Sequence, residues 1–132
     1  MKLVHVSGSR KKAIARATLK DGKGRVTVNN MALDAFEPKL ARVRIREPLV
    51  LAGDLAQKVD ISVNMHGGGI MGQSEAARLA VSKGMVDFFK SDKLKKAFLA
   101  YDRHLLVADV RQREPCKPND SKARAKRQKS YR

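Results

Sequence analysis

Three consecutive glycines, Gly67, Gly68 and Gly69, separate a segment of alternating polarity from a segment with helical apolar spacing. A glycine loop at a helix start leaves backbone N–H groups accessible, and with the positive end of the helix dipole these groups favour a phosphate oxygen. Gln73 would add a polar side-chain contact beside the loop. A tight turn that needs positive φ angles explains the same glycines without a ligand. The loop alone leaves both interpretations open, and the charge of the chain favours the phosphate.

Enzymatic uses of the glycine run fit the sequence poorly. The letters HGGG followed by AVSKG resemble the oxyanion hole and nucleophile of a lipase, but Ser82 falls among helical apolar positions. The run also lacks the ending of a nucleotide-binding loop and the glycine spacing of a dinucleotide fingerprint. With no carboxylate pair or nucleophile–base pair in view, we expect no catalytic site and no cofactor. An enzyme acting on a phosphorylated small molecule remains the rival, because such substrates also use glycine loops at helix starts.

A cluster of cations near the N-terminus is the second candidate site. Arg10, Lys11 and Lys12 follow one another in a predicted turn, and Arg16 lies on the next predicted strand. They fit a phosphate-binding corner, while a solvated run of charge is the alternative. The chain has 29 Lys and Arg against 13 Asp and Glu, a net charge of +16. Such self-repulsion favours a polyanionic partner, so we expect RNA binding, with a DNA-binding protein as another possibility.

The C-terminal segment changes in character at Arg111. Residues 111–132 contain nine Lys or Arg, two Asp or Glu, and no Leu, Ile, Val, Phe or Met. A segment that cannot bury apolar surface stays extended or disordered until it meets a partner, so we divide the chain into a globular domain, 1–110, and a basic arm, 111–132. A localisation signal or a solubilising tail is the alternative. The predicted RNA-binding residues of the arm are Lys122, Arg124, Lys126 and Arg127, followed by a tip of Lys129, Ser130, Tyr131 and Arg132, in which the tyrosine could stack on a base.

Composition excludes several other classes of protein. The 132 residues suit one domain. No apolar run approaches the roughly 18 residues of a membrane-spanning helix, and the basic clusters lack the apolar face of a membrane-surface helix. The start of the chain is too weakly apolar for a signal peptide. A single cysteine, Cys116, forms no internal disulfide and suits a reducing compartment, and the three histidines lack zinc-ligand spacing, so we expect no metal.

Periodicity predicts the elements that would position these residues. Strands are expected at 3–6, 13–19 and 59–65, and 25–29 is expected to form a hairpin with 13–19 through the turn at 21–24. Helices are expected at 31–36 with Asn30 as cap, at 39–53 with a bend near Pro48, from Ser74 to about Ser91, and over 93–101. The segment 104–110 is expected to be extended.

Four stretches together resemble a known family. They are GSRKKAIARATL, GRVTVNN, VDISVNMHGGGIMGQSEAARLA and the ending KSYR, and they resemble the universal small-subunit ribosomal protein S9 family in its archaeal and eukaryotic form, from about residue 2 to residue 132. The resemblance implies an α+β fold of two layers, mainly a four-stranded sheet packed against helices, like the second domain of ribosomal protein S5 with a left-handed βαβ crossover. An extended C-terminal tail would follow.

The resemblance also implies a function. The chain would be a structural, non-enzymatic constituent of the small ribosomal subunit in the cytoplasm, binding small-subunit ribosomal RNA in the head beside neighbouring head proteins. Its C-terminal tip, residues 129–132, would approach the peptidyl-site tRNA. Bacterial members carry a basic residue where Tyr131 stands, so a contact there would differ in kind. The acidic interruptions in REPCKPND also set this arm apart from the bacterial tails.

Overall fold

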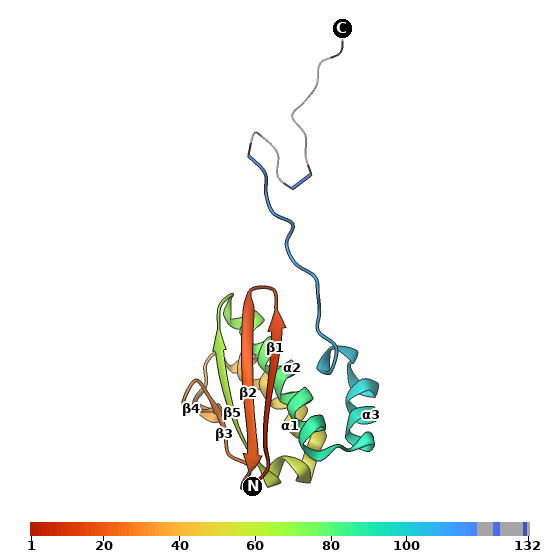
Figure 1. Ribbon diagram of the computed structural model, residues 1–132. Helices are drawn as coiled ribbons and strands as arrows, with labels where there is room; N and C mark the ends of the chain where they lie inside the picture. The colour runs from red at the N-terminus through yellow and green to blue at the C-terminus, as the bar shows by residue number, and fades with distance from the viewer. Residues whose placement is uncertain (119–122, 125–130, 132) are drawn as a thin grey trace.

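The computed structural model, which describes residues 1–118, 123, 124 and 131, is a mixed sheet with helices on one face (Figure 1). The sheet has the strand order β1-β2-β5-β3-β4. Its elements in chain order are β1 (Leu3–Arg10), β2 (Ala13–Asp21), β3 (Val26–Val28), β4 (Met31–Ala32), η1 (Leu33–Ala35), α1 (Lys39–Ala52), η2 (Gly53–Lys58), β5 (Val59–His66), α2 (Ile70–Phe89), α3 (Asp92–Tyr101) and η3 (Arg103–Leu105).

The strands β1 and β2 form an antiparallel hairpin, whose turn is made by Lys11 and Lys12. Lys11 has a φ of 54°, in the left-handed region that such short turns require. Along β2 the alternation is strict, because Ala15 and Ala17 are buried while Arg16 between them is exposed. Small buried side chains on this strand let a helix approach the sheet closely.

The predicted hairpin between 13–19 and 25–29 is wrong, because β5 lies between β2 and β3. It runs antiparallel to β2 and parallel to β3. Asp60, near the start of β5, holds the loop 21–25: its Oδ1 accepts the backbone N–H groups of Lys23 and Arg25, each at 2.9 Å. The Arg25 N–H and then the Lys23 N–H lower the pKa of Asp60. The loop therefore wraps the start of β5, and the side chain that accepts its N–H groups lies far along the sequence.

The predicted helix at 31–36 is also wrong in its first part. Asn29 and Asn30 both have positive φ angles, 47° and 67°, so they form the turn of a tight hairpin between β3 and the two-residue strand β4. Only the 3₁₀ turn η1 follows, and its N-cap is Ala32. The sheet consequently has five strands where mainly four were expected. The helix expected at 39–53 is confirmed as α1, with Pro48 inside it.

Helix α2 packs across β1 and β2 and begins earlier than expected. Its N-cap is Gly69, and Ser74, the predicted cap, is fully buried in the second turn, where its hydroxyl donates to the Met71 carbonyl at 2.7 Å. Close packing explains Gly84, where a Cβ would stand 2.4 Å from Cδ1 of Leu19. The lipase interpretation fails here too, because Ser82 is buried in mid-helix.

After α2, Ser91 caps α3 by accepting the Leu94 N–H. The segment 104–110, expected to be extended, instead begins with the 3₁₀ turn η3, in which Leu105 is buried; the rest is irregular, and none of it joins the sheet. Figure 1 shows that the β1–β2 turn, the end of β5 and the departure of the C-terminal segment all lie at the end of the molecule opposite the N-terminus. The candidate site residues are positioned at this end.

Candidate nucleic-acid interface

The glycine loop packs directly on the β1–β2 turn. Gly67 and Gly68 have φ angles of 75° and 60°, which non-glycine residues rarely adopt. A Cβ at Gly67 would stand 2.5 Å from the Lys12 carbonyl oxygen, and one at Gly68 would stand 3.0 Å from the Ala13 nitrogen. The turn interpretation is therefore confirmed for these two glycines, since the backbone of the protein itself requires them.

Gly69 differs from its two neighbours. Its φ of −102° and ψ of 169° are open to any residue, and no atom of the described chain lies within 4 Å of a Cβ built there. It is the N-cap of α2, so the first N–H groups of the helix follow it without partners inside the helix. Gly69 and these N–H groups therefore form an open part of the loop that suits a phosphate oxygen.

A cavity of about 670 Å³ joins the turn, the loop and the start of the arm. We call it the turn–loop groove. Ile70 and Met71, both exposed, give it apolar surface that the sequence analysis did not select. The sequence does carry a sign of these two residues: they are an apolar pair directly after the glycine run, outside the helical spacing of the buried positions of α2. The groove is lined by Arg10, Lys11, Lys12, Gly68, Gly69, Ile70, Met71, Gly72, Glu75, Gln112 and Arg113.

Besides Arg113 at the start of the arm, the free cations of this groove in the described part of the chain are Lys11 and Lys12. Both are exposed, and neither forms an ion pair with any residue in the described part of the chain. An ammonium group in such a position can reach an anionic ligand without first breaking an internal contact. The structure thus brings the two lysines together with the open side of Gly69.

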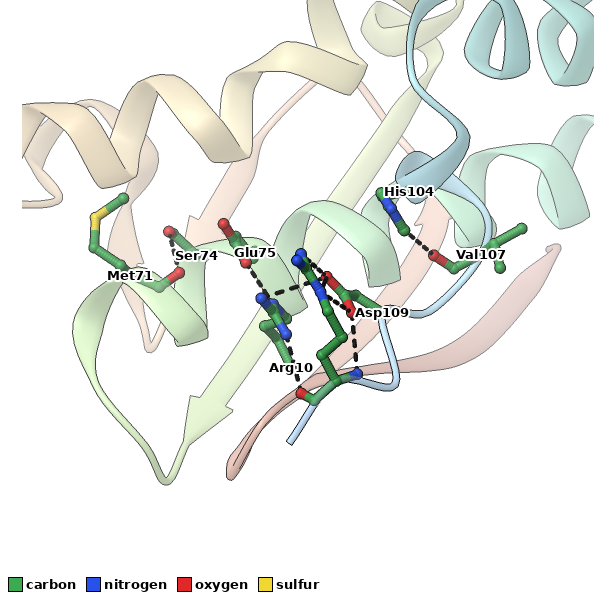
Figure 2. A network of polar contacts seen from close by, with 8 residues as sticks. Arg10, Met71, Ser74, Glu75, His104, Val107 and Asp109 are labelled. Carbon is green, nitrogen blue, oxygen red and sulfur yellow. Dashed lines mark hydrogen bonds and ion pairs between the residues drawn. The ribbon is translucent and has the colours of Figure 1, made fainter. Parts of the chain in front are cut away.

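Arg10, next to them in sequence, is already engaged inside the protein. Its side chain is only 15% exposed, and Nε donates to Oε2 of Glu75 at 2.9 Å. Its Nη2 lies 3.4 Å from Oδ2 of Asp109, and its Nη1 donates to the Arg111 carbonyl at 3.2 Å. Figure 2 shows this guanidinium between Glu75 on α2 and Asp109 on the C-terminal segment.

Asp109 accepts hydrogen bonds from Arg111 and forms an ion pair with Arg10. Nε and Nη2 of Arg111 donate to its two carboxylate oxygens, with the shortest contact 2.6 Å, and the Arg111 N–H donates to Oδ1 at 3.1 Å. The Arg111 guanidinium, its backbone N–H and then Arg10 hold the pKa of Asp109 far below its usual range. The same contacts raise the pKa of Arg111. Asp109 is therefore ionised at any physiological pH.

Two other predicted residues lie outside the groove. Nε2 of Gln73 donates to the Gly67 carbonyl at 3.0 Å, so this side chain closes the loop. Arg16 is exposed on the sheet face opposite the helices, level with Ser7 on β1 and Asn64 on β5. Arg16 therefore does not line the turn–loop groove.

Little of the predicted arm site falls within the described residues. Arg124 pairs with Glu114 at 2.8 Å, but both side chains are exposed, and such pairs contribute little to stability. Tyr131 is exposed. The other predicted arm residues lie outside the described residues: Lys122, Lys126, Arg127, Lys129, Ser130 and Arg132.

A buried arginine that the sequence analysis did not select ties the helices together. Arg78 on α2 is 6% exposed; its Nε lies 2.6 Å from Oε2 of Glu47 on α1, and its Nη2 donates to Asp102 at 3.0 Å. The His104 N–H and then Arg78 lower the pKa of Asp102. This cluster holds α2 against α1 and the end of α3, and thereby positions the segment that leads to Asp109.

The described residues contain no group of three His, Cys, Asp or Glu arranged to hold a metal ion. Over the same residues, no helix is both long and apolar enough to cross a membrane.

Comparison with known proteins identifies the family. Residues 8–132 match the family Ribosomal protein S9/S16. The chain is 52% identical to small ribosomal subunit protein uS9 of Desulfurococcus amylolyticus over 100% of its own length and 94% of that protein. It is 48% identical to the uS9 of Methanothrix thermoacetophila and 47% identical to that of Methanococcus maripaludis, each over 100% of both chains. The chain therefore belongs to the ribosomal protein S9 family.

Proposed function

We propose that the chain binds small-subunit ribosomal RNA in the head of the small ribosomal subunit, as a structural component of cytoplasmic ribosomes. Proteins of the S9 family are structural and non-enzymatic, which removes the rival enzyme acting on a phosphorylated small molecule. One observation carries the proposal: Lys11, Lys12, the open side of Gly69 and the root of the arm line one groove, in a chain of net charge +16.

In this groove the two lysines neutralise phosphates of the RNA backbone, and the first N–H groups of α2 bind a phosphate oxygen. Ile70 and Met71 offer apolar surface to a ribose or a base edge. Contacts of this kind position the protein, while the folded shape of the RNA supplies the specificity. Arg16, on the other face of the sheet, would contact a separate RNA segment or a neighbouring head protein.

The arm, 111–132, extends this binding beyond the globular domain, 1–110. Its cations follow phosphates as an extended chain, and its tip, residues 129–132, reaches the peptidyl-site tRNA. The proposal also includes the finer fold expected of the family, the S5-domain-two arrangement with a left-handed crossover. The parallel pairing of β3 with β5 through α1 provides the βαβ unit on which that expectation depends.

A salt titration tests the role of the arm in the full-length chain. The affinity for a transcribed head-domain fragment of small-subunit ribosomal RNA is measured by filter binding over a range of salt concentrations, for the native chain and for a variant with the Lys and Arg residues of 122–132 changed to Gln. We expect the log–log slope to become shallower by about 0.7–0.9 for each phosphate that the variant no longer neutralises. An unchanged slope would contradict the arm's role, and equal affinity for duplex DNA would favour the DNA-binding alternative.

Crosslinking tests the proposed tRNA contact separately. In ribosomal particles assembled with a peptidyl-site tRNA, ultraviolet irradiation is expected to link Tyr131 to the tRNA. A Tyr131→Phe variant retains an aromatic ring as the control, and Tyr131→Ala should abolish the product. A crosslink from Tyr131 to ribosomal RNA alone would show that the tip ends short of the tRNA.

A further inference from the structure

We propose that Arg10, Glu75 and Asp109 form a clamp that fixes the direction in which the arm leaves the globular domain. The inference deepens the proposed function, since an arm must start in a fixed direction if it is to follow one path through RNA. Arg10, which the sequence analysis assigned to RNA binding, is then a positioning residue for the arm.

The clamp joins three elements that are distant in sequence. Arg10 is the last residue of β1, Glu75 lies in the second turn of α2, and Asp109 follows η3. Each of the three nitrogens of the Arg10 guanidinium has a partner: Nε contacts Glu75, Nη2 contacts Asp109, and Nη1 contacts the Arg111 carbonyl. The planar fork of an arginine suits such a junction, where a lysine would supply a single point charge.

The geometry indicates that these contacts hold the backbone of the arm's first residue as well as a side chain. Asp109 is 12% exposed and is fixed from its other side by the Arg111 guanidinium. Arg10 therefore binds residues 109–111 at two points, the Asp109 carboxylate and the Arg111 carbonyl. From Gln112 to Lys117 the described chain makes no hydrogen bond or ion pair to the globular domain. Within residues 109–117 the clamp is therefore the last polar attachment to the globular domain, and Figure 1 shows the described chain beyond it leaving as an extended segment.

The clamp also controls charge in the turn–loop groove. Glu75 lines the groove beside Lys11 and Lys12, and its side chain is 39% exposed. A free carboxylate there would repel a phosphate. Because Arg10 is bound to Glu75 and Asp109, and Arg111 to Asp109, the two carboxylates are matched by two guanidinium groups. Lys11, Lys12 and Arg113 are then the cations of the groove that form no ion pair among the described residues.

Electron–electron distance measurements on the free protein test the clamp. Spin labels are placed at Gln112→Cys, one residue beyond Arg111, and at Asp87→Cys, exposed on α2, in a full-length Cys116→Ser background. We expect a single narrow distance distribution for the clamped chain. Arg10→Gln and Asp109→Asn should each replace it with a broad one, because the first residues of the arm then sample many directions.

Arg113→Gln is the matched control, because it removes a positive charge from the arm without touching the clamp. It should leave the distribution narrow. Asp109 lies outside every helix and strand, so we expect Asp109→Asn to fold even if Arg10→Gln does not. Distance distributions of equal width in the native chain and in Asp109→Asn would overturn the proposal. A control as broad as Arg10→Gln would overturn it too. Because no RNA is present, failure of the proposed RNA binding would leave this result unchanged.

Discussion

The inner and outer sides of the turn–loop groove use similar residues for different purposes. On the inner side, Arg10, Gly67 and Gly68 satisfy the protein's own contacts. On the outer side, the Lys11 and Lys12 side chains form no ion pair with the described residues, and no described atom lies within 4 Å of a Cβ built at Gly69. Neighbours in sequence and of the same type therefore belong to two classes, one that builds the site and one that is available to a ligand.

The largest expected effect is on the inner side, at Gly68. Gly68→Val places a β-branched residue at a φ of 60° and a Cβ 3.0 Å from backbone. Strained backbone of this kind costs about 1–3 kcal/mol, so we expect a clear decrease in the free energy of unfolding by urea denaturation. Gly69→Thr is the control: its φ and ψ are allowed and Thr caps helices about as well as Gly, so its stability should match the native chain.

The same two variants sharpen the comparison when RNA is added. Gly69→Thr should weaken binding to the head-domain RNA fragment in filter binding, because the added side chain projects into the groove where the RNA would approach. If the RNA affinity of this stable variant equals that of the native chain, all three glycines serve only the turn, and the outer side of the loop has no role in binding.

Sequence periodicity predicted most of the helices and strands, because an element that buries one face carries apolar residues at regular spacing. The strict alternation of β2 and β5 and the helical stripe of α2 appear in the residues themselves. The pairing of β2 with β5 leaves no regular spacing in the sequence. The acceptor that organises the loop after β2 is Asp60, 35 residues beyond Arg25, so the contact is not local. The cap at Ser74 was a local rule that failed because the helix starts with the exposed pair Ile70 and Met71.

The candidate site divides in the same way. A run of basic residues identifies Arg10, Lys11 and Lys12 equally, and only the tertiary structure separates them. The partners that engage Arg10 are Glu75, 65 positions away, and the Arg111 carbonyl, 101 positions away. Local spacing carries no information about contacts at such separations. The glycine run is visible in the sequence, while the division between Gly68 and Gly69 depends on where the β1–β2 turn packs.

The next largest effect is expected at the lysines of the outer side. Lys11→Gln/Lys12→Gln should lower the affinity for the head-domain RNA fragment and make the salt dependence shallower by about 0.7–0.9 for each phosphate that these lysines neutralise. Lys95→Gln/Lys96→Gln, which removes the same charge from exposed positions of α3, is the control. Equal decreases in affinity for the two double variants would mean that net charge, and not the groove, determines binding.

A smaller effect distinguishes neutralisation by Arg10 from direct contact with RNA. If Arg10 masks Glu75, then Glu75→Gln should raise RNA affinity much more in an Arg10→Gln background than in the native chain. Such coupling is measured by a double-mutant cycle on the head-domain fragment. If Arg10 instead donated to a phosphate, Glu75→Gln would raise the affinity by the same or a greater factor in the native background, and the coupling would vanish or change sign.

The smallest effect is in the titration of Asp109. Its lowered pKa means that the native state holds this carboxylate ionised more strongly than the unfolded chain does, whose value is near 3.8. The resulting stabilisation is present above that pH and is lost as the pH falls from there through the lower pKa of the native state. We therefore expect the clamp to be indifferent to pH across the physiological range.

Carboxyl-carbon NMR can rank the two arginines that act on this carboxylate. Arg111→Gln should raise the pKa of Asp109 more than Arg10→Gln does, because Arg111 donates three hydrogen bonds from its guanidinium while Arg10 contributes a longer ion pair at 3.4 Å. The reverse order would mean that Arg10 is the main partner of Asp109. The position of Asp109 would then depend on Arg10 alone. If the expected order is found, Arg111 mainly lowers the pKa of Asp109, and Arg10 mainly fixes where the carboxylate lies. The Asp109 carboxylate is then bound both by Arg111, the first residue of the arm, and by Arg10 of the globular domain.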